Sequence, residues 1–273
     1  MALLHSVIML AILGGCSQDG DSRGEQSSRL ILTGSSTVAP LAGEIARRFE
    51  ARQPGVRVDV QTGGSSRGIA DVRRGMADIG MVSRALSRDE ADLAGHPIAL
   101  DGVGIIVHRD NPVSALTDEQ IVAIFTGRHT RWSEVGGTDE RITIVNKAEG
   151  RATLEMFLGY FGMSSQAIRA DVVVGDNMQG VRTVAGDRSA IGYVSIGTAV
   201  YEASRGTAIR LLPMGNIEAT LANVRDGTFP LSRPLHLVTE GALSPLAEAF
   251  IAFASSREVS DLVEAQYFVP IDH

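Results

Sequence analysis

The chain has almost no cysteine: Cys16 is the only one among its 273 residues. A single cysteine excludes an internal disulfide. Long hydrophobic runs are scarce too, because the apolar stretch from Val7 to Leu13 is too short to cross a bilayer as a mature helix. The six histidines are scattered and show no metal-ligand spacing, so we expect neither a metal nor a cofactor.

The chain also lacks an excess of positive charge. Its 25 Lys and Arg residues against 32 Asp and Glu residues give a net charge of -7. Binding to a phosphate backbone requires a clustered basic face, so we expect no nucleic-acid partner. A small anion held by helix dipoles remains compatible with this composition. At 44% hydrophobic residues, the chain is long enough for one large domain or two modest lobes.

The residues before position 30 are not expected to belong to the fold. The apolar stretch ends at Leu13-Gly14-Gly15-Cys16, and residues 17–29 are rich in Ser, Gln, Asp, Gly and Glu. This pattern resembles the lipobox of bacterial lipoproteins, whose cysteine is acylated and becomes the first mature residue. The resemblance implies a signal peptide and lipobox at 1–16, a lipid anchor on Cys16 and a flexible tether at 17–29. A reactive or buried thiol is the alternative.

From Leu30 onward, apolar strands alternate with amphipathic helices. Strands are expected at 30–32, 56–60, 79–82, 98–107, 142–145, 172–174 and 190–194. Helices are expected from Leu41 through Phe49, from Ile69 through Met76, from a Thr117–Gln120 capping box through Phe125, and from Leu154 through Phe161. This order predicts an α/β fold with a parallel or mixed sheet, in which ligands bind beyond the carboxyl ends of the strands.

Small hydroxyl residues and glycine gather in the loops that follow these strands. The loops are Gly34-Ser35-Ser36-Thr37, Gly64-Ser65-Ser66-Arg67-Gly68, Ser83-Arg84 and Glu149-Gly150-Arg151-Ala152-Thr153. Helix N-termini carry unpaired N–H groups and a partial positive charge, so several of them converging on one cleft would hold an anion. The sequence therefore predicts an oxyanion site.

Each motif also has a simpler explanation. Residues 34–37 alone could be a helix N-cap, and Arg84 alone could be a solvated surface charge. Ser66 lies in a Gly-x-Ser-x-Gly pattern, which is also the nucleophile elbow of serine hydrolases. No histidine has a loop context that marks it as the partner base. Trp132 could be a stacking platform, although a lone Trp more often anchors a core.

In order along the chain, five motifs resemble the phosphate-binding proteins of bacterial ABC importers. They are Leu-Thr-Gly-Ser-Ser-Thr-Val-Ala-Pro (32–40), Thr-Gly-Gly-Ser-Ser-Arg-Gly-Ile (62–69), Ala-Asp-Ile-Gly-Met-Val-Ser-Arg (77–84), Ala-Ile-Gly-Tyr-Val (190–194) and Pro-Leu-Ser-Arg-Pro-Leu (230–235). The resemblance implies a type II periplasmic binding protein: two α/β lobes, joined by two crossover strands, with an oxyanion in the cleft. With crossovers at 98–107 and 233–238, the first lobe comprises 30–103 plus 236–273, and the second 104–235.

The resemblance also implies which residues bind the anion. They are Ser36, Thr37, Ser66, Ser83, Arg84, Lys147, Arg151, Ala152 and Thr153. The last loop departs from the family's Arg-x-x-Gly-Ser-Gly-Thr pattern, since Lys147 is a point charge and Arg151 supplies a planar fork four residues later. Ser83 stands where some members have an Asp that accepts the proton of phosphate.

The expected function is therefore the capture of inorganic phosphate for an ABC permease. We expect a monomer in the periplasm or cell envelope, anchored to a bacterial membrane through Cys16, with no catalysis. The alternatives are another tetrahedral oxyanion, such as sulphate or molybdate, or phosphate sensing. A serine hydrolase using Ser66 is a more distant alternative.

Overall fold

The computed structural model describes residues 28–271. The expected signal peptide, Cys16 and residues 17–27 of the expected tether lie outside them. Strand β1 (Ser28–Gly34) begins two residues before the expected Leu30, because Ser28 and Arg29 already pair with strand β2 (Val56–Thr62). Arg29 also forms an ion pair with Asp59. The tether prediction is therefore wrong for residues 28 and 29.

The first half of the molecule begins with three parallel strands and the two helices that connect them. Strands β1, β2 and β3 (Ile79–Val82) pair in the order β2-β1-β3, and α1 (Ala39–Arg52) and α2 (Ser65–Arg73) connect them. Helix α2 ends earlier than expected because Gly75 takes a positive φ of 65° and its N–H bonds to Val72 O. Met76, predicted to lie on this helix, is consequently outside it and 52% exposed.

The second half holds the other parallel strands. Strands β5 (Thr143–Lys147), β6 (Val172–Val174) and β7 (Ala190–Ser195) pair in the order β7-β5-β6. The helices here are α3 (Asp118–Phe125), α4 (Ala152–Phe161), α5 (Asn177–Gly186), α6 (Ile196–Ser204) and α7 (Leu221–Arg225). The predicted capping box of Thr117 and Gln120 is confirmed. Trp132 is fully buried in the core and donates its indole N–H to Ser189 O, 2.9 Å away.

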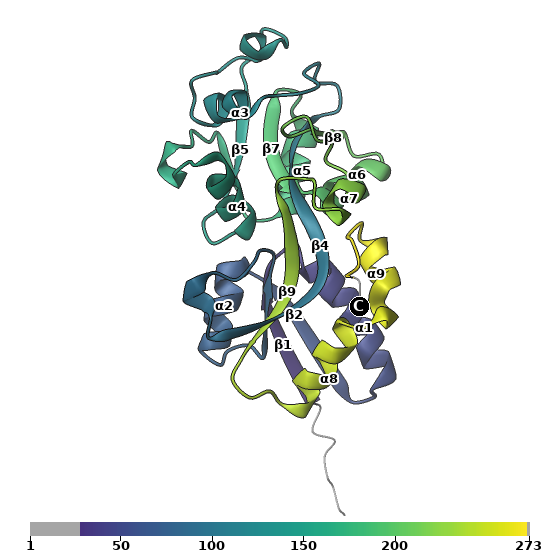
Figure 1. Cartoon of the computed structure of the whole chain (residues 1–273). Helices are drawn as coiled ribbons and strands as arrows, with labels where there is room; N and C mark the ends of the chain where they lie inside the picture. The colour runs from purple at the N-terminus through teal and green to yellow at the C-terminus, as the bar shows by residue number, and fades with distance from the viewer. Residues whose placement is uncertain (1–27, 272–273) are drawn as a thin grey trace, which may run out of the picture.

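Two long antiparallel strands run through both halves (Figure 1). They are β4 (Leu93–His108) and β9 (Ser232–Glu240), which pair with each other. Strand β9 also pairs with β3, and β4 also pairs with β7 and β8 (Ile209–Leu212). Ala99 packs in the core of the first half and Val103 in that of the second. After β9, helices α8 (Pro245–Ala254) and α9 (Ser260–Ala265) return to the first half (Figure 1).

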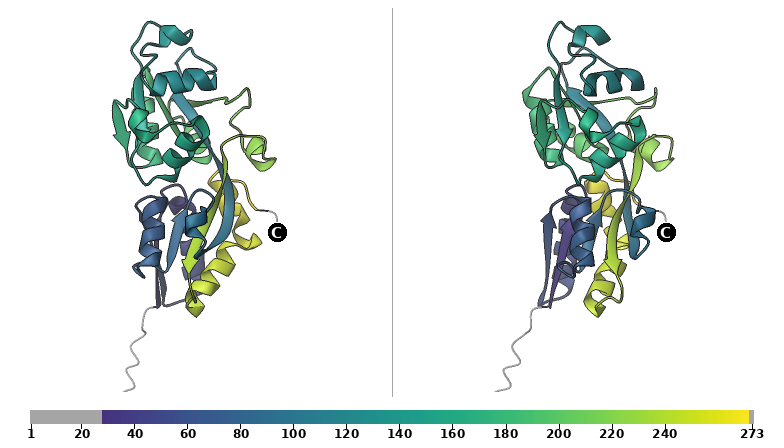
Figure 2. Two further views of the ribbon diagram at one scale, coloured as in Figure 1. Left: turned by 60° about the vertical axis from the view of Figure 1, so that its left-hand side comes forward. Right: turned by 90° about the vertical axis from the view of Figure 1, so that its left-hand side faces the viewer.

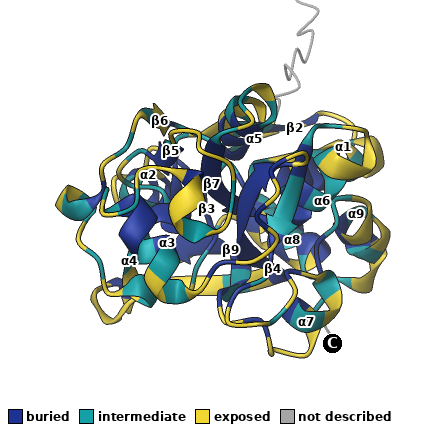
Figure 3. Ribbon diagram, turned by 90° about the horizontal axis from the view of Figure 1, so that it is seen from above, coloured by how far each residue is buried: buried dark blue, intermediate teal, exposed yellow. Residues whose placement is uncertain are grey.

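The strand ends meet in the middle of the molecule. In Figures 1 and 2, β1 runs from the N-terminal tail toward the second half, and the loops of both halves face each other there. The strands are mostly buried, whereas exposed residues lie on the outer turns of helices and on loops (Figure 3). The mixed sheet thus brings the carboxyl ends of β1, β2, β3, β5, β6 and β7 to one cleft.

Candidate functional site

Two sets of loops form the walls of this cleft. The first wall consists of residues 34–38, 63–66 and 83–84, which follow β1, β2 and β3; the second wall consists of residues 147–153 and 175–177, which follow β5 and β6. Four of these loops lead into α1, α2, α4 and α5, whose first N–H groups have no partner within the helix. The walls touch, because a Cβ on Gly64 would lie 2.5 Å from Gly150 O.

Ser35 organises the first wall. Gly34 has a φ of 132°, and a Cβ there would lie 2.3 Å from Met81 O, so only glycine fits. The Oγ of Ser35 accepts hydrogen bonds from the backbone N–H groups of Thr37 (3.2 Å) and Val38 (3.4 Å). With both lone pairs used, Ser35 donates its hydroxyl hydrogen to Ser83 Oγ, 2.9 Å away.

Thr37 and Ser83 are thereby prepared as hydrogen-bond donors. Ser83 Oγ accepts from Ser35 and from Arg233 Nη1 (3.3 Å), and Thr37 Oγ1 accepts from Asn177 Nδ2 (3.0 Å) and Arg233 Nη2 (3.3 Å). A hydroxyl has two lone pairs and one hydrogen. Since both oxygens have two incoming donors, each hydroxyl hydrogen is left to point at something else. Both side chains are buried, so these hydroxyl hydrogens are shielded from bulk water.

Arg233 links the two walls. It lies on β9, and its side chain and that of Asp101 on β4 are both fully buried in an ion pair of 2.8 Å. Its guanidinium also donates to Thr153 Oγ1 of the second wall at 3.1 Å, besides Thr37 and Ser83 of the first. A buried ion pair is tolerated only when its remaining donors and acceptors are satisfied. The hydroxyls of both walls provide that satisfaction.

Lys147 brings a buried amine to the second wall. Its side chain is buried and its Nζ donates to the backbone O of Asp176 at 2.7 Å. Desolvation lowers the pKa of Lys147 to about 7; the Asp176 carboxylate opposes this, and the positive charges of Arg233 and Arg151 add to it. A nearby anion would raise this pKa again.

Arg151 reaches across to the first wall. A Cβ built on Gly64 would lie 3.2 Å from Nη1 of Arg151, which places the guanidinium against the N-terminus of α2. Its Nε is buried, and no described residue accepts a hydrogen bond from it. A buried charged donor without a partner is costly, so this nitrogen is suited to an acceptor that arrives from outside the chain.

Ser66 and Arg84 lie in a second cluster, at the margin of the cleft. Ser66 Oγ donates to Glu155 Oε1 (2.9 Å), and Arg84 Nε donates to Glu155 Oε2 (2.6 Å). Arg84 also forms a two-pronged ion pair with Glu90 at 2.7 and 2.8 Å. This pair holds the pKa of Glu90 at about 2 and raises that of Arg84. The cluster joins the walls through the ion pairs of Arg84, and the partner of Ser66 is a carboxylate rather than a histidine.

Sequence reasoning missed the residues that organise the buried cluster. They are Ser35, Ser65, Asp101, Asn177 and Arg233. Ser65 is the buried serine of its loop and accepts from Ser83 N at 3.2 Å, whereas Ser66 is only partly buried. The available signals were an Asp inside the apolar run Ala99–Val107 and the Arg of the Ser-Arg-Pro-Leu motif.

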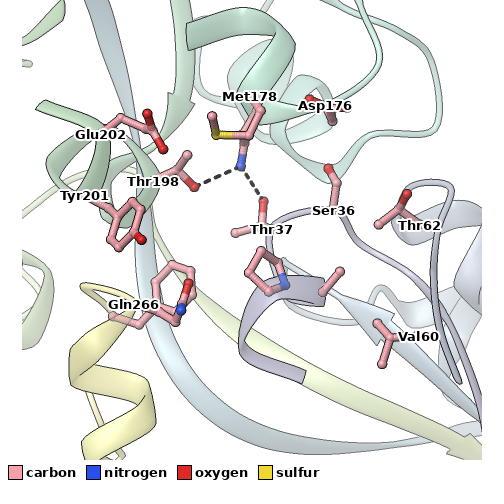
Figure 4. A pocket seen from close by; sticks show the side chains of 14 residues that line it. Ser36, Thr37, Val60, Thr62, Asp176, Met178, Thr198, Tyr201, Glu202 and Gln266 are labelled. Atoms are coloured by element: carbon pink, nitrogen blue, oxygen red, sulfur yellow. Dashed lines mark hydrogen bonds between the residues drawn. The ribbon is translucent and has the colours of Figure 1, made fainter. Parts of the chain in front are cut away.

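A groove of about 560 Å³ opens beside Ser36 and Thr37. It is lined by α1, β2, the first turn of α5, α6 and the segment after α9 (Figure 4). Asn177 Nδ2 donates to Thr37 Oγ1 at 3.0 Å and to Thr198 Oγ1 at 3.4 Å. In Figure 4, dashed lines end on these two threonines. The groove thus borders the buried hydroxyl cluster at Thr37.

Comparison with known proteins covers nearly the whole chain. A family described as PBP superfamily domain matches residues 21–258. The phosphate-binding protein PstS of Bacillus subtilis is 27% identical over 99% of this chain and 93% of its own length. The phosphate-binding protein PstS of Pseudomonas aeruginosa is 26% identical over 90% of this chain and 84% of its own length.

Solved structures agree with these relatives. A structure from Clostridium perfringens, described as a phosphate ABC transporter substrate-binding protein with bound phosphate, superposes with a TM-score of 0.83 and 30% identity, over 90% of this chain and all of the other. An ABC-type phosphate transport receptor from Vibrio cholerae gives 0.73 and 29%, over 89% of this chain and all of the other. The observed fold is therefore the predicted two-lobed periplasmic binding protein fold.

Proposed function

Because this chain belongs to the PBP superfamily and, within it, to the PstS-like substrate-binding proteins, we propose that it captures inorganic phosphate between its two walls and delivers it to an ABC importer. The names of its relatives support the ligand and the importer. The observation that carries the proposal is Arg233, which is buried in contact with Thr37 and Ser83 of one wall and Thr153 of the other.

The anion would be held by donors from both walls. Thr37 and Ser83 offer hydroxyl hydrogens, Arg151 offers a guanidinium with a free Nε, and Lys147 adds charge. The proposed ligand-binding set is Ser36, Thr37, Ser66, Ser83, Arg84, Lys147, Arg151, Ala152 and Thr153, to which we add Arg233. Within this set, Ser66 and Arg84 would act at the margin by holding the walls together through Glu155.

A second candidate is a fully ionised oxyanion such as sulphate or molybdate. Ser83 supports it, because its hydroxyl is left as a donor where some family members have a proton-accepting carboxylate. Calorimetric titration with phosphate, sulphate and molybdate separates the two candidates. Tight binding of phosphate alone supports the first, whereas comparable binding of sulphate would replace it with a general oxyanion function.

We propose capture without turnover. Ser66 donates its hydroxyl hydrogen to Glu155, whose other oxygen accepts from Arg84, so the partner of this serine is an ion-paired carboxylate rather than the histidine of a Ser-His pair. The purified protein should not hydrolyse activated esters. Ester hydrolysis that disappears in Ser66→Ala would instead establish a hydrolase.

The cellular placement follows from the N-terminal pattern. We propose that Cys16 carries a lipid that tethers a monomeric, extracytoplasmic protein. We also propose that two lobes close around the ligand: the first comprises 30–103 plus 236–273, and the second comprises 104–235. Within residues 28–271, no helix is long and apolar enough to span a membrane. Radiolabelled fatty acid should be incorporated into the parent and not into Cys16→Ala; equal labelling would exclude the anchor.

A further inference from the structure

A third segment of the chain passes between the two halves, besides β4 and β9. It is Gln266–Val269, which we call the C-terminal link. Phe268 packs in the core of the first half, and the next residue, Val269, packs in the core of the second. Val269 forms two backbone hydrogen bonds with Leu100 of β4, at 2.8 and 2.9 Å, and Leu100 also faces Pro234 of β9. The link therefore meets both crossing strands at the boundary between the two cores.

Tyr267 occupies a position in this link where helices usually have glycine. Tyr267 N donates to Glu264 O (2.9 Å) and Phe268 N donates to Val263 O (3.1 Å), which is the hydrogen-bond pattern of a Schellman motif at the end of α9. Tyr267 takes the left-handed position of that motif, with a φ of 56°. Because a Cβ is unfavourable in this conformation, glycine would suit the end of α9 better.

The side chain of Tyr267 contacts the second half of the molecule. Its ring packs edge-on against Tyr201 of α6, with centroids 6.1 Å apart, and its hydroxyl lies 3.5 Å from Ser204 Oγ. The backbones are close too, since a Cβ on Gly197 of α6 would lie 2.6 Å from Tyr267 O and from the ring of Phe268. Backbone strain persists only where the surrounding structure compensates for it. Here the compensation is a contact between the halves.

Gly197 connects this contact to the buried ion pair of the anion site. Its N–H donates to Asp101 Oδ1 at 3.1 Å, while Asp101 Oδ2 accepts from Arg233 Nε (3.1 Å) and Nη2 (2.8 Å). One carboxylate thus bonds α6 through one oxygen and Arg233 through the other. Asp101 and Arg233 are both buried, so a shift of α6 would leave a buried polar group without its partner.

We propose that the C-terminal link is a third connection between the halves, in which Tyr267 holds α6 in place and thereby positions Asp101 and Arg233 for the anion. Tyr267 is a positioning residue, because it acts through α6. The effect on the anion rests on the proposed function, whereas the connection between the halves does not need a ligand.

Two substitutions separate the ring of Tyr267 from its backbone. Tyr267→Ala and Tyr267→Gly both remove the ring, but only glycine relieves the left-handed strain. Both variants should release radiolabelled phosphate faster than the parent by a similar factor, ~2- to 30-fold, the range of coupling through a packed network. Chemical denaturation should find Tyr267→Gly more stable than Tyr267→Ala. If release follows stability instead, so that Tyr267→Gly behaves like the parent, the ring does not position the site.

Asn216 provides the matched control. It is the other non-glycine residue with a positive φ (64°) within residues 28–271, and it is exposed in a loop of the second half. Asn216→Gly should leave the release rate unchanged. Tyr267→Phe, which keeps the ring, should also release phosphate at nearly the rate of the parent.

Small-angle X-ray scattering without phosphate tests the connection by itself. Unliganded Tyr267→Ala and Tyr267→Gly should have a larger radius of gyration than the parent, because the halves separate more easily. If the parent binds phosphate but the radii and release rates of all variants are equal, the link is wrong and the proposed function stands. If the parent does not bind phosphate, the proposed function is wrong, and equal radii would then overturn the link as well.

Discussion

The hydroxyl groups of the first wall bond to one another, whereas the second wall brings two basic side chains, Lys147 and Arg151, to the cleft and leaves the Nε of Arg151 unsatisfied. Ser35, Ser65 and Ser83 satisfy one another within the first wall. In the second wall, burial lowers the pKa of Lys147 to about 7, and Arg151 has a buried Nε without a described partner. An anion therefore gains positioning from one wall and most of its electrostatic attraction from the other.

This difference assigns distinct roles to the two halves. The hydroxyl groups of the first wall can stay preformed in the open molecule, because Ser35, Ser65 and Ser83 are uncharged and hydrogen-bonded to one another. The repulsion between Lys147 and Arg151 in the second wall is offset only when an anion binds, so ligand binding and closure should be coupled. Arg233 belongs to neither wall and contacts both, which makes it the test of whether they act as one site.

The largest effect is expected when the link between the walls is removed. Arg233→Met leaves Asp101 buried and unpaired, and breaking such a pair costs about 3–5 kcal/mol. Chemical denaturation should show this loss, and phosphate binding should be lost with it. The double variant Arg233→Met, Asp101→Leu removes the orphaned charge; it should recover stability without recovering binding. Phosphate affinity restored in the double variant would show that the walls work without Arg233.

Arg151 tests the second wall alone. Arg151→Ala should reduce phosphate affinity by ~10- to 150-fold, the effect of losing about 1.5–3 kcal/mol of charge-assisted hydrogen bonding. Arg151→Lys should recover only part, because an ammonium cannot reproduce the planar fork. Folding stability should not fall, since the Nε has no described partner to lose. If calorimetry shows that Arg151→Ala binds phosphate as tightly as the parent does, Arg151 does not contact the anion.

Paired serine variants test the first wall. Ser65 is buried against Ser83, while Ser66 bonds to Glu155 at the margin. Ser65→Ala should therefore weaken phosphate binding by up to ~10-fold, the value of one neutral hydrogen bond of about 0.5–1.5 kcal/mol. Ser66→Ala should act mainly through closure, with a faster release rate in stopped-flow measurements. The reverse ranking of the two equilibrium affinities would restore Ser66 as the direct contact.

The smallest expected effect is a pH dependence contributed by Lys147. Its pKa of about 7 means that the positive charge disappears as the pH rises through neutrality. The affinity of the parent, divided by that of Lys147→Met at the same pH, should therefore fall a few-fold between pH 6 and 8. Dividing by the variant removes the titration of phosphate itself. If the ratio does not change with pH, the charge of Lys147 does not contribute to phosphate binding.

The stability of the unliganded protein should change in the opposite sense. The pKa of Lys147 is about 7 in the folded chain against an ordinary 10.5, so between these values the unfolded chain binds the additional proton. The free energy of unfolding should rise with pH across that window, and Lys147→Met should lack this rise.

Local signals in the sequence predicted the strands, several helices and the hydroxyl loops. The Thr117 capping box and the alternation at Val56–Val60 depend on neighbours only a few residues apart, and both elements formed. Met76 was misplaced because helical spacing continued past Gly75, whose positive φ ended the helix. The start of β4 at Leu93, before the expected Ile98, depends on pairing with Glu240 in β9.

The core of the site could not be predicted in the same way. Arg233 and Asp101 are 132 residues apart, and no local pattern indicates that a charged side chain in one strand will meet one in another. Ser65 and Ser66 are adjacent, so the sequence could not decide which faces the cluster. The backbone at Gly64, whose φ of 99° orients the first turn of α2, determines that Ser65 faces the buried cluster.

The crossing of the strands also determines the order in which the protein can fold. Apart from Val269, the buried residues of the second half's main core all lie between Val103 and Leu231, so most of this half can collapse as soon as they are available. The first half cannot, because β3 lies beside β9, and Ser83 meets its partner Arg233 only 150 residues later. Until β9 arrives, one edge of β3 is an unpaired template for other strands. Refolding should therefore proceed in two phases. Any aggregation should begin from the first half, which contains the unpaired edge of β3.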